Sequence, residues 1–345
     1  MDAYSALPIV SKSVIKKSKQ AYFTDIHNDS LVAEFTSGST GEPFVCYKTA
    51  RERNVYSLRL WRERRRLDRH VSPSNFMELF DSATRKFGVN FVDLAEENLH
   101  KIFTVISNNQ PRWLCLSPSM AFYYAKFHML HKYRLDSLRF IELQGEYIDF
   151  LQRKMIEEAF GVRTVVHYGL RECWTVAYEC ECNRMHIFDD FFLLDASYER
   201  LLLTSAINQY MPIVKYDTGD TGEILWLDEC TCGRNNTYIL NVSNARQAQR
   251  IQGDMFSSII YKKVIKSTIE HFGYDDSLIL GYFVTEEGGC IHMHIEPGEK
   301  YSDEVEKVIV NNMRMYFREC FRISVDYGVK PVLSRSGKQS ELIML

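Results

Sequence analysis

Features that direct a protein to or across a membrane are missing from the sequence. It contains no apolar run long enough to span a bilayer, and residues 1–19 carry scattered lysines but no apolar core of the signal-peptide kind. Excess positive charge is missing too, because the formal net charge is −3, which argues against general nucleic-acid binding. Repeats and low-complexity segments are also absent. We therefore expect a cytoplasmic protein with no membrane and no nucleic-acid partner.

The composition is that of a globular protein large enough for two folding units. Its 345 residues can bury a full core, and the apolar content of 46% and charged content of 25% are ordinary. Nine cysteines, an odd number in a chain expected in the cytoplasm, predict thiols or metal ligands rather than disulfides. The composition leaves open whether the chain forms a homodimer.

A loop rich in glycine and hydroxyl groups lies between two apolar runs, 31–35 and 44–47, whose pattern is typical of strands. The loop reads Thr36-Ser37-Gly38-Ser39-Thr40-Gly41-Glu42-Pro43. Glycines let the backbone curl, so that main-chain N–H groups and hydroxyls can surround phosphate oxygens. The pattern predicts a phosphate-binding loop, and the alternative is an ordinary polar hairpin turn.

Strands and helices alternate through the middle of the chain. Strands are expected at 113–116, 138–143 and 162–166, and helices at 49–67, after Ser117-Pro118, and at 147–160. This rhythm predicts a layered α/β domain over residues 1–245. A basic run in the first helix is expected to be a solvated face rather than a phosphate or RNA site. It consists of Arg62, Arg64, Arg65 and Arg66.

Residues 246–345 are expected to form a second, smaller domain. Helices at 262–272 and 302–317, with strands at 278–285, 289–295 and 322–328, make a module of about 95 residues, an ordinary domain size. The predicted fold is therefore α/β, with a large layered N-terminal domain and a small C-terminal α+β domain.

Two polar segments follow predicted strands, which is where an open α/β sheet binds its ligand. Gly145-Glu146 follow the strand at 138–143, and a segment from His167 through Tyr168-Gly169 to Glu172 follows the strand at 162–166. An aromatic ring at such a position can cover an adenine, and a carboxylate can hold Mg²⁺.

A third polar segment, residues 212–220, ends in Asp217-Thr218-Gly219-Asp220. A carboxylate such as Asp220 can accept hydrogen bonds from two adjacent hydroxyls at once, as a ribose offers them. The alternative is a turn between two strands, because Asp-Thr-Gly-Asp also has suitable turn chemistry.

Two close cysteine pairs, Cys180/Cys182 and Cys230/Cys232, lie on either side of that segment, with His186 nearby. Thiolate and imidazole ligands suit a closed, tetrahedral zinc site. Each pair has one intervening residue, rather than the two of common zinc knuckles, so the spacing leaves a metal site and free buried thiols equally open.

In this order, the segments resemble the motifs of adenylate-forming (AMP-binding) enzymes. The loop at 36–43 is similar to the family phosphate loop, with Glu42 in place of lysine. Tyr168 to Glu172 match Tyr-Gly-x-x-Glu, and 212–220 match Pro-x-x-Arg-Tyr-x-Thr-Gly-Asp, with Lys215 in place of arginine. Such a match implies a large adenylation domain at 1–245 and a small mobile domain at 246–345.

Segments near both ends add to the resemblance. Residues 7–12, Leu-Pro-Ile-Val-Ser-Lys, resemble a segment of phenylacetate–CoA ligases and their capsule-biosynthesis relatives, which implies a member with a shortened N-terminus. Asn244-Ala245-Arg246 resembles the lead into the family hinge, where this chain has Ala248-Gln249 in place of the usual acidic pair or Asp-Lys. Ser336-Gly337-Lys338 resembles the setting of the family's C-terminal lysine.

The resemblance also implies residue roles. The candidate catalytic residues are Lys338, Glu172 and Thr40, with Glu172 as the Mg²⁺ ligand. The candidate nucleotide-binding residues are Thr36, Ser37, Gly38, Ser39, Thr40, Gly41, Gly145, Glu146, Tyr168, Gly169, Asp220 and Arg246. Tyr168 would stack on adenine, Asp220 would hold the ribose hydroxyls, and Arg246 would contact ribose and phosphate.

The implied reaction joins a carboxylic acid, aromatic or acyl, to ATP with Mg²⁺ and gives an acyl-adenylate and pyrophosphate. A thiol such as CoA, or an amine, then displaces AMP. Three possibilities stay open: a CoA ligase, an acid–amine ligase of capsule or natural-product synthesis, and a catalytically degenerate nucleotide-binding scaffold. The sequence names neither the acid nor the acceptor.

Overall fold

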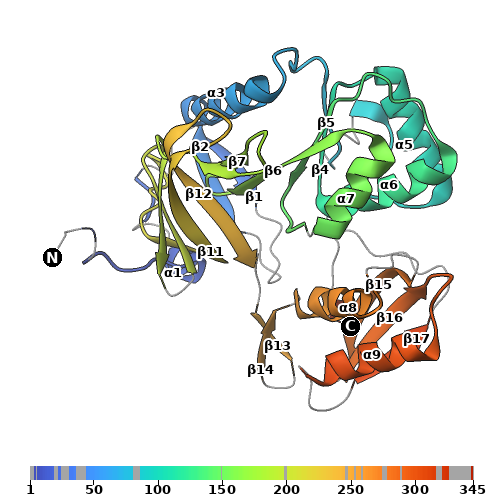
Figure 1. Cartoon of the computed structure of the whole chain (residues 1–345). Coiled ribbons are helices and arrows are strands. Elements are labelled where there is room, and N and C mark those ends of the chain that lie inside the picture. Colours follow the sequence, from blue (N-terminus) through green and yellow to red (C-terminus); the bar gives the residue numbers. More distant parts are fainter. Residues whose placement is uncertain are drawn as a thin grey trace. The chain divides into compact units, whose positions relative to one another are not determined.

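The computed structural model describes residues 4, 6–18, 22–24, 31–35, 44–80, 86–148, 150–197, 200–244, 248–251, 254–257, 259–273, 278–287, 290–315, 321–325 and 343–344. The chain divides into two units, 1–245 and 246–345, and each is described by itself (Figure 1). Among the described residues, no helix combines the length and apolar character needed to cross a bilayer.

The first unit is built on a ten-stranded sheet with one parallel and one antiparallel half. The strand order is β3 (Phe76–Glu78), β4 (Trp113–Leu116), β5 (Phe140–Gln144), β6 (Arg163–Leu170), β7 (Trp174–Glu179), β8 (Met185–Ile187), β12 (Asn235–Asn244), β11 (Tyr216–Glu229), β10 (Arg200–Ser205) and β9 (Phe192–Ser197). Neighbours from β3 to β6 are parallel, and the remaining pairs are antiparallel. The α/β fold predicted from the sequence is confirmed.

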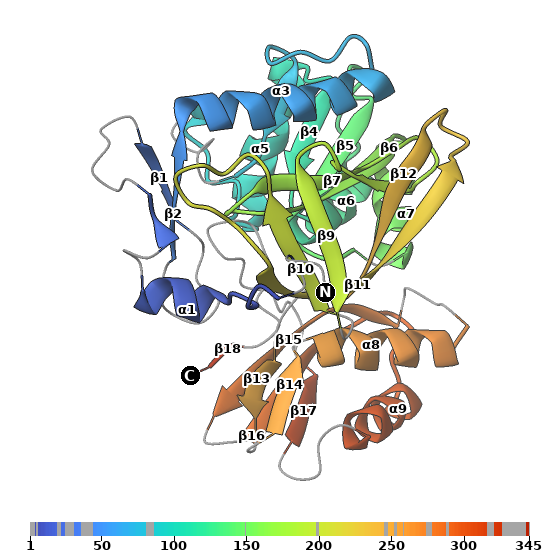
Figure 2. The same cartoon turned by 90° about the vertical axis from the view of Figure 1, so that its left-hand side faces the viewer.

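Helices cover both faces of the parallel half. Figure 1 shows α5 (Glu96–Asn109), α6 (Pro118–His131) and α7 (Phe150–Phe160) gathered beside β4 and β5, whereas Figure 2 shows α3 (Ala50–Leu67) crossing the sheet as one long helix. Side chains alternate along β5, so Ile141 and Leu143 share one face and Glu142 points to the other, where Arg64 of α3 meets it. The three central residues of β5 are all buried, as expected of a strand covered on both sides.

Local sequence explains where these helices begin. Thr49 caps α3, because its hydroxyl accepts from the Glu52 N–H at 3.1 Å and the Glu52 carboxylate accepts from the Thr49 N–H at 2.6 Å. Ser117 caps α6, and Pro118 occupies its first turn, where a missing N–H costs nothing.

A separate two-stranded sheet holds the ends of the predicted phosphate loop. β1 (Leu31–Phe35) and β2 (Val45–Thr49) are antiparallel, with Phe35 opposite Val45. The short helix α1 (Lys12–Lys17) precedes them, and Val10 forms a bridge to Tyr216 of the large sheet. The loop itself, 36–43, lies outside the described residues.

The predicted end of one strand is wrong, and a turn considered as an alternative is not formed. β6 does not end at 166 but continues to Leu170, and Asp217–Asp220 is part of the long strand β11. In each case an antiparallel neighbour, β7 or β10, extends the pairing past the point where the local sequence indicates an end. Cross-strand pairing overrides local turn chemistry here.

The arginine run on α3 is only partly a solvated face. Arg62, Arg65 and Arg66 are exposed, whereas Arg64 is buried and donates two hydrogen bonds to Glu142, at 2.8 and 2.7 Å. A fork of two parallel bonds suits a guanidinium and a carboxylate. The expectation of a fully solvated helix face was therefore wrong at Arg64.

The second unit has its own sheet and core. Its elements are β13 (Ala248–Ile251), β14 (Asp254–Ser257), α8 (Ile259–His271), β15 (Ile279–Glu287), β16 (Cys290–Pro297), α9 (Asp303–Arg314), β17 (Phe321–Val325) and β18 (Ile343–Met344). The strand order of the larger sheet is β17-β16-β15-β18. Alternate residues of β16, Ile291, Met293 and Ile295, are buried against α8 and α9 side chains such as Val264 and Ile309.

Candidate functional site

Two of the predicted segments meet at one edge of the large sheet. β5 and β6 are parallel, with Gln144 opposite His167, so Gly145-Glu146 and Tyr168 follow neighbouring strand positions. Gly145 has φ +86°, which lets the chain turn sharply as it leaves the strand. The Glu146 carboxylate accepts from the Ser119 N–H at 2.9 Å, at the first turn of α6.

Asp220 belongs to the same site, because Tyr168 reaches it across the sheet. The Tyr168 hydroxyl donates to Asp220 Oδ2 at 2.7 Å. Both side chains are buried, at 9% and 3% exposure. A carboxylate can accept about four hydrogen bonds, so this bond does not by itself prevent Asp220 from accepting ribose hydroxyls.

Gly169 is required by the backbone of this region. The ladder between β6 and β7 shifts register at Tyr168/Gly169, and a Cβ on Gly169 would lie 2.2 Å from the Trp174 carbonyl oxygen. No side chain can be accommodated at that distance, so the bulge next to Tyr168 depends on glycine.

Glu172 sits in the tight turn between β6 and β7, in which the Cys173 N–H donates to the Leu170 carbonyl oxygen at 3.1 Å. Its side chain is 1% exposed, and its Oε1 accepts from the Tyr216 hydroxyl at 2.9 Å. Asn208 donates to the Glu172 carbonyl oxygen at 3.2 Å. A buried carboxylate needs such partners because desolvation is costly.

The site therefore contains two acids that are each bonded by a tyrosine, Asp220 by Tyr168 and Glu172 by Tyr216. Reasoning from the sequence missed Tyr216 and Asn208 as members of this site. Tyr216 stands inside the predicted segment 212–220, four residues before Asp220 on the same strand, β11. Asn208 gave no local signal, because only the folded chain brings it to Glu172.

Lys215 lies close to these residues but faces the N-terminal segment. Its Nζ donates to the Leu7 carbonyl oxygen at 2.9 Å and lies 5.4 Å from the centre of the Tyr4 ring. Main-chain hydrogen bonds join the same segments. The Val10 N–H donates to the Lys215 carbonyl oxygen at 3.0 Å, and the Asp217 N–H donates to the Val10 carbonyl oxygen at 2.9 Å. In this structure Lys215 anchors the segment at residues 7–10.

Known proteins resemble this chain in fold. No family model and no curated protein sequence matches the chain. Solved structures do match. A 2-hydroxyisobutyryl-CoA ligase in the postadenylation state, in complex with R3-HIB-AMP, has a TM-score of 0.71 and 12% identity, over 98% of this chain and 80% of that one. The chain has the fold of adenylate-forming enzymes.

Other enzymes with this fold form amides. The acyl acid amido synthetase AtGH3.15, in complex with 2,4-DB, matches with a TM-score of 0.61 and 11% identity, over 93% of this chain and 80% of that one. The amide bond synthetase McbA from Marinactinospora thermotolerans matches with a TM-score of 0.56 and 12% identity, over 91% of this chain and 68% of that one. The fold is thus shared by CoA ligases and amide-forming enzymes.

Several predicted site residues lie outside the described part of the chain. They are Thr36, Ser37, Gly38, Ser39, Thr40 and Gly41 of the loop, together with Glu42, Arg246 and Lys338. Their roles stay predictions from the sequence. Residues 248–249, at the position of the family hinge, begin the short strand β13.

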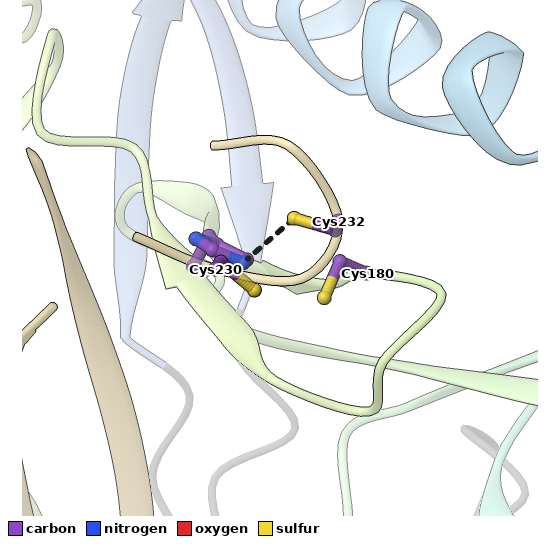
Figure 3. A group of neighbouring side chains, drawn as sticks. Cys180, Cys230 and Cys232 are labelled. Carbon is purple, nitrogen blue, oxygen red and sulfur yellow. Dashed lines mark hydrogen bonds between the residues drawn. The ribbon is translucent and has the colours of Figure 1, made fainter. Parts of the chain in front are cut away.

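The cysteine pairs form a second candidate site at the β7–β8 and β11–β12 turns. Ligand atoms of Cys180, His186, Cys230 and Cys232 all lie within 4.8 Å of one another. Figure 3 shows the three thiols converging from two separate turns, and Cys232 Sγ lies 3.5 Å from His186 Nε2. Cys182 does not join them, because its sulfur accepts from the Thr231 hydroxyl at 2.9 Å.

The two turns have the same build. Each reads Cys-x-Cys, then a residue with positive φ (Asn183 or Gly233), then arginine. The N–H of the first cysteine donates to the carbonyl oxygen of that arginine, at 2.9 Å in the Cys180 turn and 2.7 Å in the Cys230 turn. The repeat is visible in the sequence as Cys-Glu-Cys-Asn-Arg and Cys-Thr-Cys-Gly-Arg.

The donor set fits zinc. Three sulfurs and one imidazole nitrogen make a closed tetrahedral set, with bonds of about 2.0–2.3 Å to the metal. His186 Nδ1 lies 3.1 Å from the Thr237 hydroxyl, which leaves Nε2 directed at the thiols. Burial, with nearby arginines, lowers the pKa of His186 to about 4, and burial raises the pKa of the Cys180 thiol to about 12. A bound metal ion deprotonates coordinating thiols.

Proposed function

We propose that this protein activates a carboxylic acid with MgATP, forming an acyl-adenylate and releasing pyrophosphate. The observation that carries the proposal is the buried hydrogen bond from Tyr168 to Asp220, with Glu172 in the turn after Tyr168 and bonded by Tyr216 of the strand that carries Asp220. These residues come from two separate sequence motifs, and their side chains suit an adenine, a ribose and Mg²⁺. They converge in a fold whose solved members include a ligase bound to an acyl-AMP.

Each motif has a distinct part in the proposed reaction. Tyr168 covers the adenine, Asp220 accepts from the ribose hydroxyls, and the loop at 36–41 surrounds the phosphates with N–H and hydroxyl donors. Glu172 would hold Mg²⁺, which commonly binds through one or two carboxylates and the substrate's phosphates and neutralises their charge. Catalysis is then positioning and charge stabilisation, without a covalent nucleophile.

The test is acid-dependent exchange of pyrophosphate into ATP. Purified protein with Mg²⁺, ATP and labelled pyrophosphate is incubated with a panel of aromatic, short-chain and hydroxylated carboxylic acids. Exchange that requires one class of acid supports the proposal and names the substrate class. An absence of exchange with every acid, in a protein that binds MgATP, favours the degenerate scaffold instead.

The second candidate function, a catalytically degenerate nucleotide-binding scaffold, has a specific observation in its favour. Asp220 and Glu172 are almost fully buried and already accept hydrogen bonds from tyrosines, so the acids are part of the core as well as the site. Nucleotide binding without exchange would identify a scaffold. Loss of exchange on removing either acid would identify an enzyme.

The acceptor is proposed to be a thiol, such as CoA, or an amine. Support for both comes from the matched structures, which include a CoA ligase and two amide-forming synthetases. Once the acid is known, AMP release is followed with CoA and with a set of amines. The acceptor that accelerates AMP release decides between an acid–thiol and an acid–amine ligase.

We also propose that Cys180, His186, Cys230 and Cys232 bind one structural zinc ion. Such a site joins the β7–β8 turn to the β11–β12 turn and so stabilises the antiparallel half of the sheet. We expect Cys232→Ser to lower the zinc content and the melting temperature, whereas Cys182→Ser, in the other turn, should retain both. Zinc is measured by elemental analysis, and a ratio near zero in the native protein would overturn the proposal.

A further inference from the structure

A fully buried lysine lies beside the candidate active site. The side chain of Lys48, on β2, has 0% exposure. Its Nζ lies 3.1 Å from Glu34 Oε2 on β1 and donates to the Arg171 carbonyl oxygen at 2.6 Å. Burying an ammonium is costly unless it is paired and hydrogen-bonded, so these two partners define where Lys48 can be accommodated.

Glu34 extends the same connection to the other end of the Glu172 turn. The Oε2 atom that contacts Lys48 also accepts from the Trp174 indole N–H at 2.7 Å. Trp174 begins β7 with φ +56°, a backbone conformation that residues other than glycine seldom adopt. Glu34 and Lys48 therefore hold both sides of the turn, at Arg171 and at Trp174, with Glu172 between them.

β1 and β2 are the strands that enter and leave the predicted phosphate loop. Glu34 is opposite Cys46 and Lys48 is opposite Val32, so the two charged residues are diagonal neighbours on one face of this pair. Their ion pair holds the two strands together next to the loop. The same ion pair touches the turn of Glu172, more than 100 residues further along the chain.

We propose that Lys48 is a positioning residue that holds the turn carrying Glu172 against the β1–β2 pair. The inference rests on the proposed function, because MgATP is the ligand that Glu172 would help to bind. Mg²⁺ demands near-ideal octahedral geometry, with bonds of about 2.0–2.1 Å, so a small shift of Glu172 relative to the phosphates has a large effect. The buried contact at Arg171 holds that turn in place before nucleotide binds.

The test uses the full chain and three variants. Lys48→Met removes the ammonium. A double variant, Lys48→Met with Glu34→Gln, also removes the carboxylate charge that would be left unpaired. Lys48→Arg keeps the positive charge. The matched control is Arg112→Met, because Asp68 likewise accepts from an indole, that of Trp113 at 3.0 Å, and pairs with an arginine. That control cluster lies where α3 ends and β4 begins.

Two measurements are made on each variant. ATP binding is measured by calorimetry over a range of Mg²⁺ concentrations, and amide hydrogen exchange is followed at 31–35 and 170–174. We expect the double variant to weaken MgATP binding roughly tenfold to a hundredfold, in line with the effect of a displacement of about 1 Å in an active site. Excess Mg²⁺ should recover part of the loss, and both segments should exchange faster without nucleotide.

Lys48→Arg should restore part of the affinity, whereas Arg112→Met should leave MgATP affinity and both segments unchanged. Unchanged exchange at 170–174 in the double variant would overturn the proposal, because the turn would not depend on Lys48. An MgATP affinity of the double variant equal to that of the wild type would overturn it too, and would leave the proposed function intact. A wild-type protein that binds no MgATP would overturn the proposed function and the role of Lys48 in it together.

Discussion

At the scale of single residues, the candidate site is made of buried acids paired with phenols. Asp220 accepts from Tyr168, and Glu172 accepts from Tyr216. These bonds orient each carboxylate and satisfy part of its hydrogen-bonding capacity in the folded protein. A ligand that binds here enters an arrangement of fixed acceptors, which is the condition for selective recognition of hydroxyls and metal.

Asp220→Ala should weaken ATP binding roughly tenfold to a hundredfold, because hydrogen bonds to a charged group contribute about 1.5–3 kcal/mol. Calorimetry with ATP measures this. Tyr168→Phe should cost less, since the ring that would cover adenine is kept and only the bond to Asp220 is lost.

The control is Asp190→Ala. It removes a carboxylate outside the candidate site whose Oδ2 lies 3.0 Å from Arg59 Nε. Its ATP affinity should match the wild type. Equal affinity of Asp220→Ala and wild type would mean that Asp220 only stabilises the strand.

At the scale of elements, α3 is joined to the sheet by charged groups rather than by apolar packing alone. Arg64 donates to Glu142 of β5, and the buried Glu63 pairs with Arg59 and with Arg234 of the second cysteine turn. The Tyr178 hydroxyl donates to Glu142 at 2.8 Å, and His167 Nδ1 lies 3.1 Å from the same carboxylate. α3 is thereby held against both the parallel half and the cysteine turns.

Glu142 should make stability depend on pH. Burial raises the pKa of Glu142, but the charge and hydrogen bonds of Arg64, together with His167, hold it well below its usual range. A depressed pKa gives a contribution that is complete above the unfolded value of 4.5 and is lost as the pH falls below it. Glu142→Gln should therefore cost about 3–5 kcal/mol near neutral pH, as for breaking a buried ion pair.

Urea unfolding of wild type and Glu142→Gln from neutral pH to about pH 3 measures the difference in their free energies of unfolding. That difference should shrink steadily below pH 4.5, the ordinary pKa of glutamate. Glu97→Gln, which removes one partner of an exposed pair with Lys101, is the control and should follow the wild type. A difference that is constant over the whole range would show that the pKa of Glu142 is the same in the folded and unfolded states.

At the scale of the whole molecule, the chain divides between Ala245 and Arg246 into two units that each have their own core. The candidate nucleotide residues that the structure describes all belong to the first unit. Lys338 belongs to the second and lies outside the described residues. On the proposed function, Tyr168 and Asp220 bind nucleotide from the first unit and Lys338 acts from the second, so the two roles can be tested separately.

Lys338→Ala should reduce acid-dependent pyrophosphate exchange by roughly 10²–10³-fold, as for the loss of one group that stabilises developing charge. ATP should still bind, because Tyr168 and Asp220 are unchanged. Supplied with preformed acyl-adenylate, the variant should still pass the acyl group to its acceptor, because that half-reaction places no new charge on the α-phosphate.

Lys330→Ala is the control, since it removes a lysine from the same unit outside the family motif. Its exchange rate should equal that of the wild type. Normal exchange in Lys338→Ala would mean that this lysine does not reach the reacting groups, and equal loss of both half-reactions would indicate damage to the unit as a whole.

The sequence by itself determined the elements whose signals are local. Helix starts at Thr49 and Ser117 depend on side chains within three residues, and the buried strand 113–116 depends on four consecutive apolar residues. The motif residues Tyr168, Glu172 and Asp220 were proposed from short patterns of residue types that resemble those of a family, and their roles stay predictions. Such features need no knowledge of distant parts of the chain.

Only the tertiary structure decided which distant residues meet. The burial of Arg64 and the exclusion of Cys182 from the cysteine cluster both depend on partners far along the chain. The extent of β6 and β11 depends on pairing with neighbouring strands. Lys48 is the clearest case, because a lysine at the end of an apolar strand gives no sign that Arg171 and Glu34 will enclose it. Long-range packing selects among the positions that local chemistry permits, since burying a charge is tolerated only where its partners are already in place.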